Sequence, residues 1–278
     1  MSNTISVSIC IPTYNQTKYL RKTLDSIVNQ TYKDFELIIS DDSSTEDVSN
    51  LLVEYKNKLP FHYVRNTPGL GSPQNWNHAI SLAKGSWIKI MHHDDWFCES
   101  YSLEKMMDVA EKNPHSLIFA GIKGEFVNEK RSYVNLPSKS TVSELQKDPF
   151  LLIWLNLIGP PSTILFPNTQ IKFDKKLIWL VDVEFYLNLL IHKQLSLVYI
   201  EEILFENCQD DHNITNECFQ NKELELKEFN YVFNKFFTNP TISQRIKFMK
   251  SFKKYLSSYC SSTYLELLIS QIKNKPVC

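Results

Sequence analysis

Residues 5–15 read ISVSICIPTYN, an alternating and then continuous apolar run that ends in polar residues. This pattern predicts a buried first strand over residues 5–11, followed by a loop. Residues 35–40 (FELIIS) predict a second strand, which also ends in polar side chains, at residues 41–44 (DDSS). Between them, residues 17–30 carry apolar side chains at helical spacing. The start of the chain therefore predicts a strand–helix–strand unit.

The same alternation continues along the first half of the chain. We expect strands at 61–64, 87–91 and 117–120, and helices at 46–57, 73–83 and 100–112. Strands and helices that alternate with short connections predict an α/β fold, with a mostly parallel sheet sandwiched by helices. Ligands bind such sheets outside the carboxyl ends of the strands, and three polar clusters follow strands here: residues 13–15, 41–42 and 94–95.

The pattern is weaker in the second half. Residues 128–143 are polar and predict a loop, and the apolar run 149–158 predicts a buried helix that is too short to span a bilayer. Further along, we expect a strand at 164–166, a helix at 181–192, a strand within 195–205, and helical structure from 218 onward with a break at 239–240.

Composition narrows the functional classes. The 278 residues carry a net charge of −1, which argues against a nucleic-acid partner. Six scattered cysteines show no zinc-binding spacing, and the first residues do not resemble a targeting segment, so we expect a cytoplasmic protein with free thiols. Residues 241–278 hold seven basic side chains against one acid. This basic segment is either a solvated helix face or a peripheral contact with the inner face of a membrane.

Glycine is scarce, with six residues, roughly a third of the usual share. The chain has no P-loop, and the GLG at 69–71 lacks the third glycine of a dinucleotide-binding loop, so a glycine-rich phosphate cradle is excluded. Asp94 and Asp95, by contrast, place two carboxylates together at a strand end. Like charges this close favour recruitment of a cation, and Mg²⁺ or Mn²⁺ held by carboxylates can bind a diphosphate.

Several short motifs, taken in order, resemble a known family. They are residues 9–15, 26–31 (SIVNQT), 35–44, 75–79 (NWNHA), 85–89 and 94–96. Together they resemble a family 2 glycosyltransferase with the GT-A fold, well over residues 5–125 and loosely over 155–215. The resemblance implies a catalytic domain over 1–215, with a nucleotide-sugar half (1–125) and an acceptor half (126–215), and a helical extension over 216–278.

The resemblance also implies a nucleotide-sugar donor, and specifically a UDP-sugar. Pro12, Thr13 and Tyr14 would line the base pocket, and Asp41 would accept a hydrogen bond from uracil N3. Asp94 would be a metal ligand of the family's DxD motif, in which His92 stands in place of the first acid and either ligates the metal or contacts the ribose or phosphate. His212 is expected as a second metal ligand. The implied donor site comprises Pro12, Thr13, Tyr14, Asn15, Asp41, Asp42, Asn75, His92, His93 and Asp95.

The family places an acidic base on a helix of the second half. Asp182, within residues 179–185 (WLVDVEF), is the candidate, with Val181 in place of the usual glutamate. The resemblance implies that this carboxylate removes a proton from an acceptor hydroxyl as it attacks the sugar with inversion. Residues 159–163 would form the acceptor-side loop. The implied acceptor is a glycan or a lipid-linked saccharide, in surface polysaccharide synthesis.

Two other functions compete with this interpretation. The substitutions at His92 and Val181 are compatible with a catalytically silent module that binds nucleotide-sugars or glycans. A nucleotidyltransferase would also use acids to hold metal and phosphates, but its first loop should be rich in glycine and arginine, and residues 10–20 contain neither. Finally, residues 41–44 on their own are also typical of a turn and helix cap.

Overall fold

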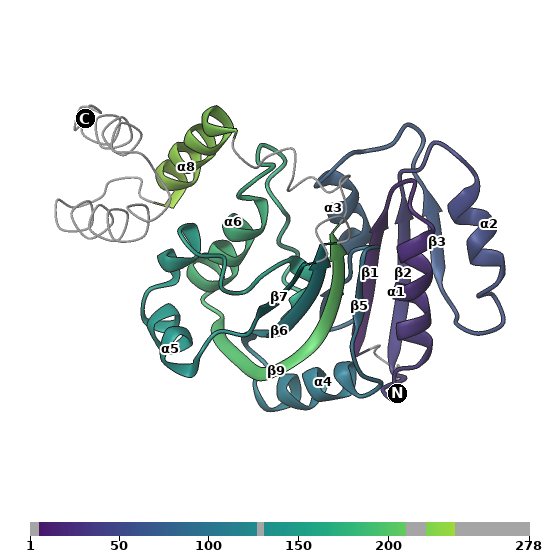
Figure 1. Cartoon of the computed structure of the whole chain (residues 1–278), viewed down its shortest axis with the longest axis horizontal. Helices are drawn as coiled ribbons and strands as arrows, with labels where there is room; N and C mark the ends of the chain where they lie inside the picture. The colour runs from purple at the N-terminus through teal and green to yellow at the C-terminus, as the bar shows by residue number, and fades with distance from the viewer. Residues whose placement is uncertain (1–5, 127–130, 210–220, 237–278) are drawn as a thin grey trace.

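The computed structural model describes residues 6–126, 131–209 and 221–236, which form one curled, nine-stranded sheet with helices packed on it (Figure 1). The strand order is β3-β2-β1-β4-β8-β6-β9-β5, and β7 pairs with β6. In chain order the elements are β1 (Val7–Thr13), α1 (Lys18–Val28), β2 (Phe35–Asp41), α2 (Asp47–Val53), β3 (His62–Arg65), α3 (Gln74–Ser81), β4 (Trp87–Ile90), β5 (Asp95–Phe97), α4 (Ser102–Lys112), β6 (Ser116–Phe126), β7 (Arg131–Asn135), α5 (Lys139–Lys147), η1 (Pro149–Ile153), η2 (Pro161–Thr163), β8 (Ile164–Pro167), α6 (Val181–Leu187), η3 (Asn188–His192), β9 (Ser196–Gln209) and α8 (Lys222–Phe236).

The first four strands of the sheet are parallel, as predicted. Strand β1 lies between β2 and β4, and β2 also pairs with β3. All seven residues of β1 are buried, because helices cover both faces of a parallel sheet. The register pairs Thr13 with Asp41 and Asp41 with Arg65, so these polar residues meet at one edge of the sheet.

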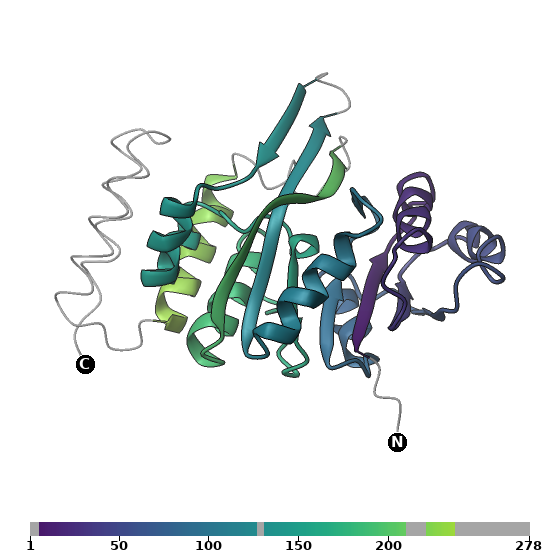
Figure 2. The ribbon, with the colours of Figure 1, turned by 90° about the horizontal axis from the view of Figure 1, so that it is seen from below.

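The second half of the sheet is mixed, because antiparallel strands interrupt the parallel arrangement there. Strand β8 is antiparallel to both β4 and β6, and β5 is antiparallel to β9. The long strands β6 and β9 run parallel, side by side across the molecule (Figure 2). Side-chain periodicity identifies strands but carries no information about their direction, so only the folded chain shows where the sheet reverses.

Some local predictions of the second half were also wrong. The polar stretch 128–143 contains β7 and the start of α5, and Ser138 caps α5 by accepting a hydrogen bond from the Thr141 amide at 3.2 Å. This stretch is polar because it is largely exposed, not because it lacks regular structure. The apolar run at 149–158 forms a short 3₁₀ turn, η1, with Leu152 and Ile153 buried.

The C-terminal region is helical where the structure describes it, in α8. The boundary at 215/216, His212 and the basic segment 241–278 lie outside the described residues. Across the described ranges, none of the helices combines the length and the apolar character needed to cross a membrane.

Candidate active site

Three side chains that follow β4 form a cluster with the donor set of a divalent-cation site. One ligand atom from each of His92, Asp94 and Asp95 lies within 4.8 Å of the others. Buried His92 Nε2 and Asp95 Oδ2 have no hydrogen-bond partner within the described part of the chain. Buried polar atoms without a hydrogen-bond partner are rare in proteins, so these two atoms are candidates to bind a ligand. The residues therefore fit the Mg²⁺ or Mn²⁺ that the sequence predicted.

The backbone of this cluster is held by three separate elements. Thr23 of α1 donates its hydroxyl to the carbonyl oxygens of His93 and Asp95, at 3.1 and 2.8 Å. The amide of Cys208 in β9 donates to the Asp94 carbonyl at 3.3 Å. Ser162 of η2 accepts a hydrogen bond from the His92 amide at 2.9 Å. The ligand side chains thus project from a rigid loop, as a preformed site requires.

His92 is present as a neutral imidazole. Burial lowers its pKa to about 4, despite the opposing effect of Asp94. The ring packs on Trp76 of α3, with 4.5 Å between ring centroids. Neutral imidazole is the form that coordinates metals, so His92 can take the place of the missing first acid. Nitrogen donors suit Mn²⁺ better than Mg²⁺, which prefers oxygen ligands.

A buried lysine lies beneath the cluster. Lys89 of β4 is 0% exposed, and its Nζ donates to the Ser162 and Ile164 carbonyls and packs 3.9 Å from the Phe205 ring centroid. Burial holds its pKa well below the usual range, and the nearby Asp95 raises it. Burial likewise raises the pKa of Asp95, as does Asp94, whereas Ser162, Lys89 and Asn207 lower it. Lys89 thereby offsets part of the repulsion within the acidic cluster.

Replacing Lys89 with methionine is expected to destabilise the fold by about 3 kcal/mol, because removing one member of a buried charged group leaves the other without compensation. Urea unfolding measures the change, with Lys84→Met as the control, since the Lys84 side chain is exposed. A loss of stability equal to that of the control would contradict this role for Lys89.

The edge formed by β1, β2 and α3 brings several buried polar groups together. Thr13 is 1% exposed and its hydroxyl has no partner among the described residues, while its carbonyl accepts from the Asp42 amide and the Asn75 side chain, at 3.0 and 3.2 Å. Asp42, 9% exposed, accepts from the Leu70 and Gly71 amides. These contacts bring together segments that the sequence had placed at separate strand ends.

Asp41 lies at the end of β2, opposite Thr13, as the sequence predicted, but its side chain binds other groups of the protein. Its side chain is 0% exposed. Its Oδ1 accepts from the Ser43 amide at 2.9 Å and its Oδ2 from the Tyr63 hydroxyl at 2.8 Å. Both oxygens accept from protein donors at the end of β2. The neighbouring Asp42 likewise accepts on both oxygens, from Asn66 and from the Leu70 and Gly71 amides, and is slightly more exposed.

The remaining donor-site candidates differ in position. Pro12 is buried within β1, opposite Ser40 in the register, whereas Tyr14 is 59% exposed. Asn15 adopts a positive φ of 47° and is tied to the β2 loop, because its amide donates to Ser43 Oγ at 2.8 Å and its side chain accepts from the Ser44 amide at 3.1 Å. His93 is partly buried beside the acidic cluster.

Asp182 lies in the first turn of α6 and has the properties of a general base. Its Oδ1 is buried and has no hydrogen-bond partner among the described residues. Burial raises its pKa to about 7, which is where a base works best near neutral pH. One turn later, Tyr186 is fully buried and donates to the Gly159 carbonyl at 2.8 Å, in the predicted acceptor-side loop.

Tyr186 also connects the two acidic groups. Burial raises its pKa well above the usual range, and the negative charges of Asp182 and Asp95 add to the shift. The loop that contains Gly159 also contains Ser162, which accepts a hydrogen bond from the His92 amide, so one loop contacts both α6 and the acidic cluster. The fold brings the candidate base and the candidate metal cluster to the same site.

Some site residues were missed by the sequence analysis: Asn66, Lys89, Tyr186 and Asn207. Lys89 did have a signal, since it interrupts the otherwise apolar run 87–91 (WIKIM) in a strand that is buried throughout. Asn66 donates to Ser40, Asp42 and Asn75, and nothing in the sequence indicated that convergence.

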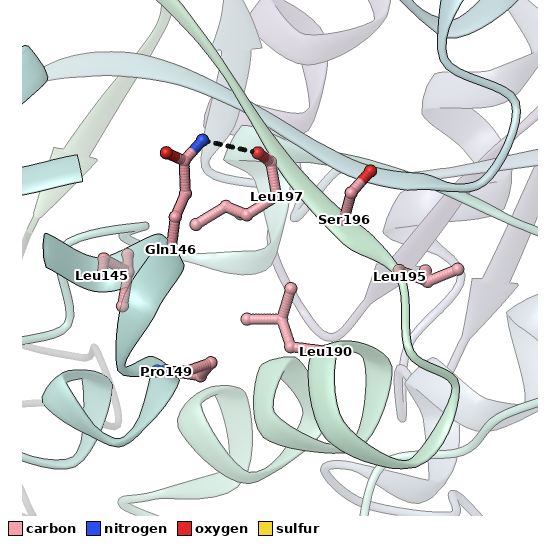
Figure 3. Close-up of a pocket in the computed structure, with 7 residues that line it drawn as sticks. All are labelled: Leu145, Gln146, Pro149, Leu190, Leu195, Ser196 and Leu197. Atoms are coloured by element: carbon pink, nitrogen blue, oxygen red, sulfur yellow. Dashed lines mark hydrogen bonds between the residues drawn. The ribbon is translucent and has the colours of Figure 1, made fainter. Parts of the chain in front are cut away.

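A separate cavity of about 270 Å³ lies between α5, η3 and the start of β9 (Figure 3). Its wall is mostly leucine, and the Gln146 side chain donates to the Leu197 carbonyl there at 2.9 Å. Residues 195–197 are at the beginning of β9, whereas Asn207, near Asp95, is at its end. The cavity is therefore not part of the acidic site.

A parallel half-sheet with polar residues at its strand ends, a cluster with the donor set of a cation site and a buried, unpaired carboxylate on a helix of the second half are the features that the sequence predicted for a glycosyltransferase of the GT-A type. The comparisons agree. The model of the family described as "Glycosyl transferase family 2" matches residues 8–169, and the chain belongs to this family.

Relatives and solved structures support the same class. An uncharacterized glycosyltransferase of Rickettsia typhi is 27% identical over 259 residues, covering 90% of this chain and 77% of the relative. A poly(ribitol-phosphate) beta-glucosyltransferase of Bacillus spizizenii is 33% identical over 126 residues, 43% of this chain and 19% of that one.

Among solved structures, S. aureus TarS residues 1–349 in complex with UDP-GlcNAc superposes with a TM-score of 0.69 at 16% identity, covering 96% of this chain and 80% of that one. The mannosyltransferase PcManGT from Pyrobaculum calidifontis, in complex with GDP-Man and Mn²⁺, gives a TM-score of 0.59 at 12% identity, with 96% and 79% covered. At these identities the likeness concerns the fold. The protein is a glycosyltransferase.

Proposed function

We propose that this glycosyltransferase moves a sugar, with inversion, from a UDP-sugar to a hydroxyl group of a glycan or lipid-linked saccharide, with the help of Mn²⁺ or Mg²⁺. The observation that carries the proposal is that the loop at residues 159–163 contacts both α6, which carries Asp182, through Tyr186, and the cluster of His92, Asp94 and Asp95, through the His92 amide. Neighbouring proteins bound to UDP-GlcNAc, or to GDP-Man and Mn²⁺, support the donor class and the metal.

Each part of the site has a separate task in this proposal. Thr13, Asp42 and Asn75 bind the base and ribose, and His92, Asp94 and Asp95 hold the metal. The bound cation would neutralise charge that develops on the leaving diphosphate. Asp182 takes the proton from the acceptor hydroxyl as that oxygen attacks the sugar. A single base and no covalent intermediate give inversion.

A donor screen tests the proposal. Release of UDP, GDP or dTDP from a panel of their sugars is measured with Mn²⁺, Mg²⁺ or EDTA, in the presence of glycans, lipid-linked saccharides and poly(ribitol phosphate). We expect metal-dependent release from a UDP-sugar. Donor binding by calorimetry without any turnover would favour the silent binding module, and preference for a GDP- or dTDP-sugar would contradict the uridine assignment.

The pH profile of the reaction should follow the ionisation of Asp182. A base must be deprotonated, so with a pKa of about 7 the rate is expected to rise about tenfold per pH unit below pH 7 and to level off above it. With a pKa of about 4, His92 stays neutral over this range and does not limit metal binding. Rates measured from pH 5.5 to 8.5 at saturating Mn²⁺ provide the check, and a flat profile would contradict the assignment.

We also propose a cytoplasmic location with peripheral contact at the inner face of a membrane through the basic segment 241–278. The support is the charge of that segment and the lipid-linked class of acceptor. Co-sedimentation with vesicles with and without anionic lipid tests it, and equal binding to both would contradict it.

A further inference from the structure

Helix α8 contacts the helix that carries Asp182 through a buried carboxylate. Glu228 is 2% exposed. Its Oε1 accepts from the Ile178 amide at 2.7 Å, and its Oε2 accepts from the amides of Trp179 and Leu180 at 2.9 and 2.8 Å. One carboxylate therefore binds the three consecutive N–H groups that lead into α6.

This contact anchors the segment that enters α6, a helix with no side-chain cap of its own. The helix has only seven residues, and its N-cap residue is Leu180, whose side chain cannot accept a hydrogen bond. Helix starts leave N–H groups without partners, and a negative charge near them is stabilising. Because the local sequence supplies no cap, Glu228, 48 residues away along the chain, binds the entry to the helix.

A second contact from the same face of α8 holds α6 on the other side of Asp182. Lys235 lies two turns after Glu228, and its Nζ lies 2.6 Å from Glu184 Oε1 and 2.8 Å from Asp174 Oδ2. Glu184 is 0% exposed, and its pKa is raised by burial and lowered by Lys235 and Asn188. The Tyr231 hydroxyl also donates to Asp174, at 2.7 Å.

Apolar packing keeps α8 in place along its length. Val232 is fully buried, Phe229 stacks on Trp154 with ring centroids 5.5 Å apart, and Phe236 stacks on His192 at 5.2 Å. Both polar contacts therefore come from a helix that is fixed by its own packing.

We propose that Glu228 and Lys235 are positioning residues of the transfer reaction. They hold α6 at residue 180 and at residue 184, on either side of Asp182, and so set where its carboxylate lies relative to the acidic cluster. The inference rests on the proposed role of Asp182 as base. Misplacement of a catalytic group by about 1 Å can lower the rate about 100-fold, so loss of a positioning contact can have an effect of this size on the rate.

The test compares Glu228→Gln with Glu223→Gln, a matched change at an exposed position of the same helix. Glutamine keeps the size of Glu228 but directs an NH₂ group at backbone N–H donors. We expect kcat to fall about 10- to 100-fold, with unchanged donor KM and unchanged affinity for UDP and Mn²⁺, because the donor edge is built from β1, β2 and α3. Glu223→Gln should leave kcat, donor KM and the affinities for UDP and Mn²⁺ unchanged.

A double-substitution cycle separates positioning from a general loss of structure. If Glu228 acts through Asp182, Glu228→Gln should lower the rate of the parent protein but add nothing in an Asp182→Asn background. Hydrogen exchange should increase in residues 178–187 and stay unchanged in residues 7–41. A parallel fall of kcat and UDP affinity, full activity of Glu228→Gln, or a further loss in the Asp182→Asn background would each overturn the inference.

Lys235→Gln provides a second, independent variant if Glu228→Gln does not fold. For this variant too, we expect kcat to fall and the donor KM to stay unchanged. Failure of the inference differs from failure of the proposed function. If Asp182→Asn is inactive and Glu228→Gln fully active, only the positioning role is wrong. If Asp182→Asn itself keeps full activity, the assignment of the base is wrong.

Discussion

Asp182→Asn is expected to lower the rate of sugar transfer by about 10³-fold, within the range that general-base catalysis contributes. Asparagine has nearly the same shape as aspartate but cannot accept the proton of the attacking hydroxyl. The Oδ1 atom of Asp182 is buried without a partner, so the substitution breaks no hydrogen bond to that atom within the described structure. Affinity for UDP and Mn²⁺ should therefore stay the same, as measured by calorimetry.

The change should also stabilise the fold slightly, because it replaces a carboxyl whose pKa burial has raised to about 7. A group of this kind favours folding in its protonated form, and that contribution is present at low pH and disappears as the pH rises through 7. Asp108→Asn, at an exposed position of α4, serves as the control. Full activity of Asp182→Asn would remove Asp182 as the base.

The second large effect is expected for Asp94→Asn. Loss of a carboxylate ligand weakens metal binding, and with it the compensation of charge on the leaving diphosphate, which we expect to cost about 10²- to 10³-fold in rate. In contrast to Asp182→Asn, this variant should show weaker binding of Mn²⁺ in a titration followed by thermal shift with UDP present. The two variants should therefore fail in distinguishable ways.

High Mn²⁺ should recover part of the activity of Asp94→Asn, since His92 and Asp95 remain in the cluster. No such recovery is expected for Asp182→Asn. Turnover by Asp94→Asn equal to that of the parent protein, at the same metal concentration, would show that Asp94 is not a ligand. The control is again Asp108→Asn, which keeps the acidic cluster intact.

The choice between Asp41 and Asp42 shows where sequence reasoning reached its limit. Both acids end the same strand, and consecutive residues of a strand point to opposite faces. The motif places a carboxylate at this strand end but does not say which of the two faces the ligand. In the structure, Asp41 accepts from Ser43 and Tyr63 and is 0% exposed, whereas Asp42 accepts from Asn66 and from the loop at residues 69–71 and is 9% exposed.

The scarcity of glycine has a clear meaning in the structure. Of the six glycines, Gly159 has a φ of 91°, and its carbonyl accepts the hydrogen bond from Tyr186. Gly85 has no room for a side chain, because a Cβ would lie 2.6 Å from the Ser8 amide nitrogen. These residues serve turns and close packing. The acidic cluster, not backbone amides, supplies the proposed means of holding a diphosphate.

The sequence by itself determined the strands and helices of the first half, except the short strand β5, and that polar clusters follow β1, β2 and β4. These features depend on local periodicity and on residues adjacent in the chain. Tertiary structure alone decided the reversal of the sheet at β8, the contact of Lys89 with Ser162, 73 residues away, and the contact of Glu228 with the start of α6. Each of these features joins segments that are distant in the sequence. The charges and hydrogen bonds of Lys89 and Glu228 also depend on burial, which only the folded chain creates.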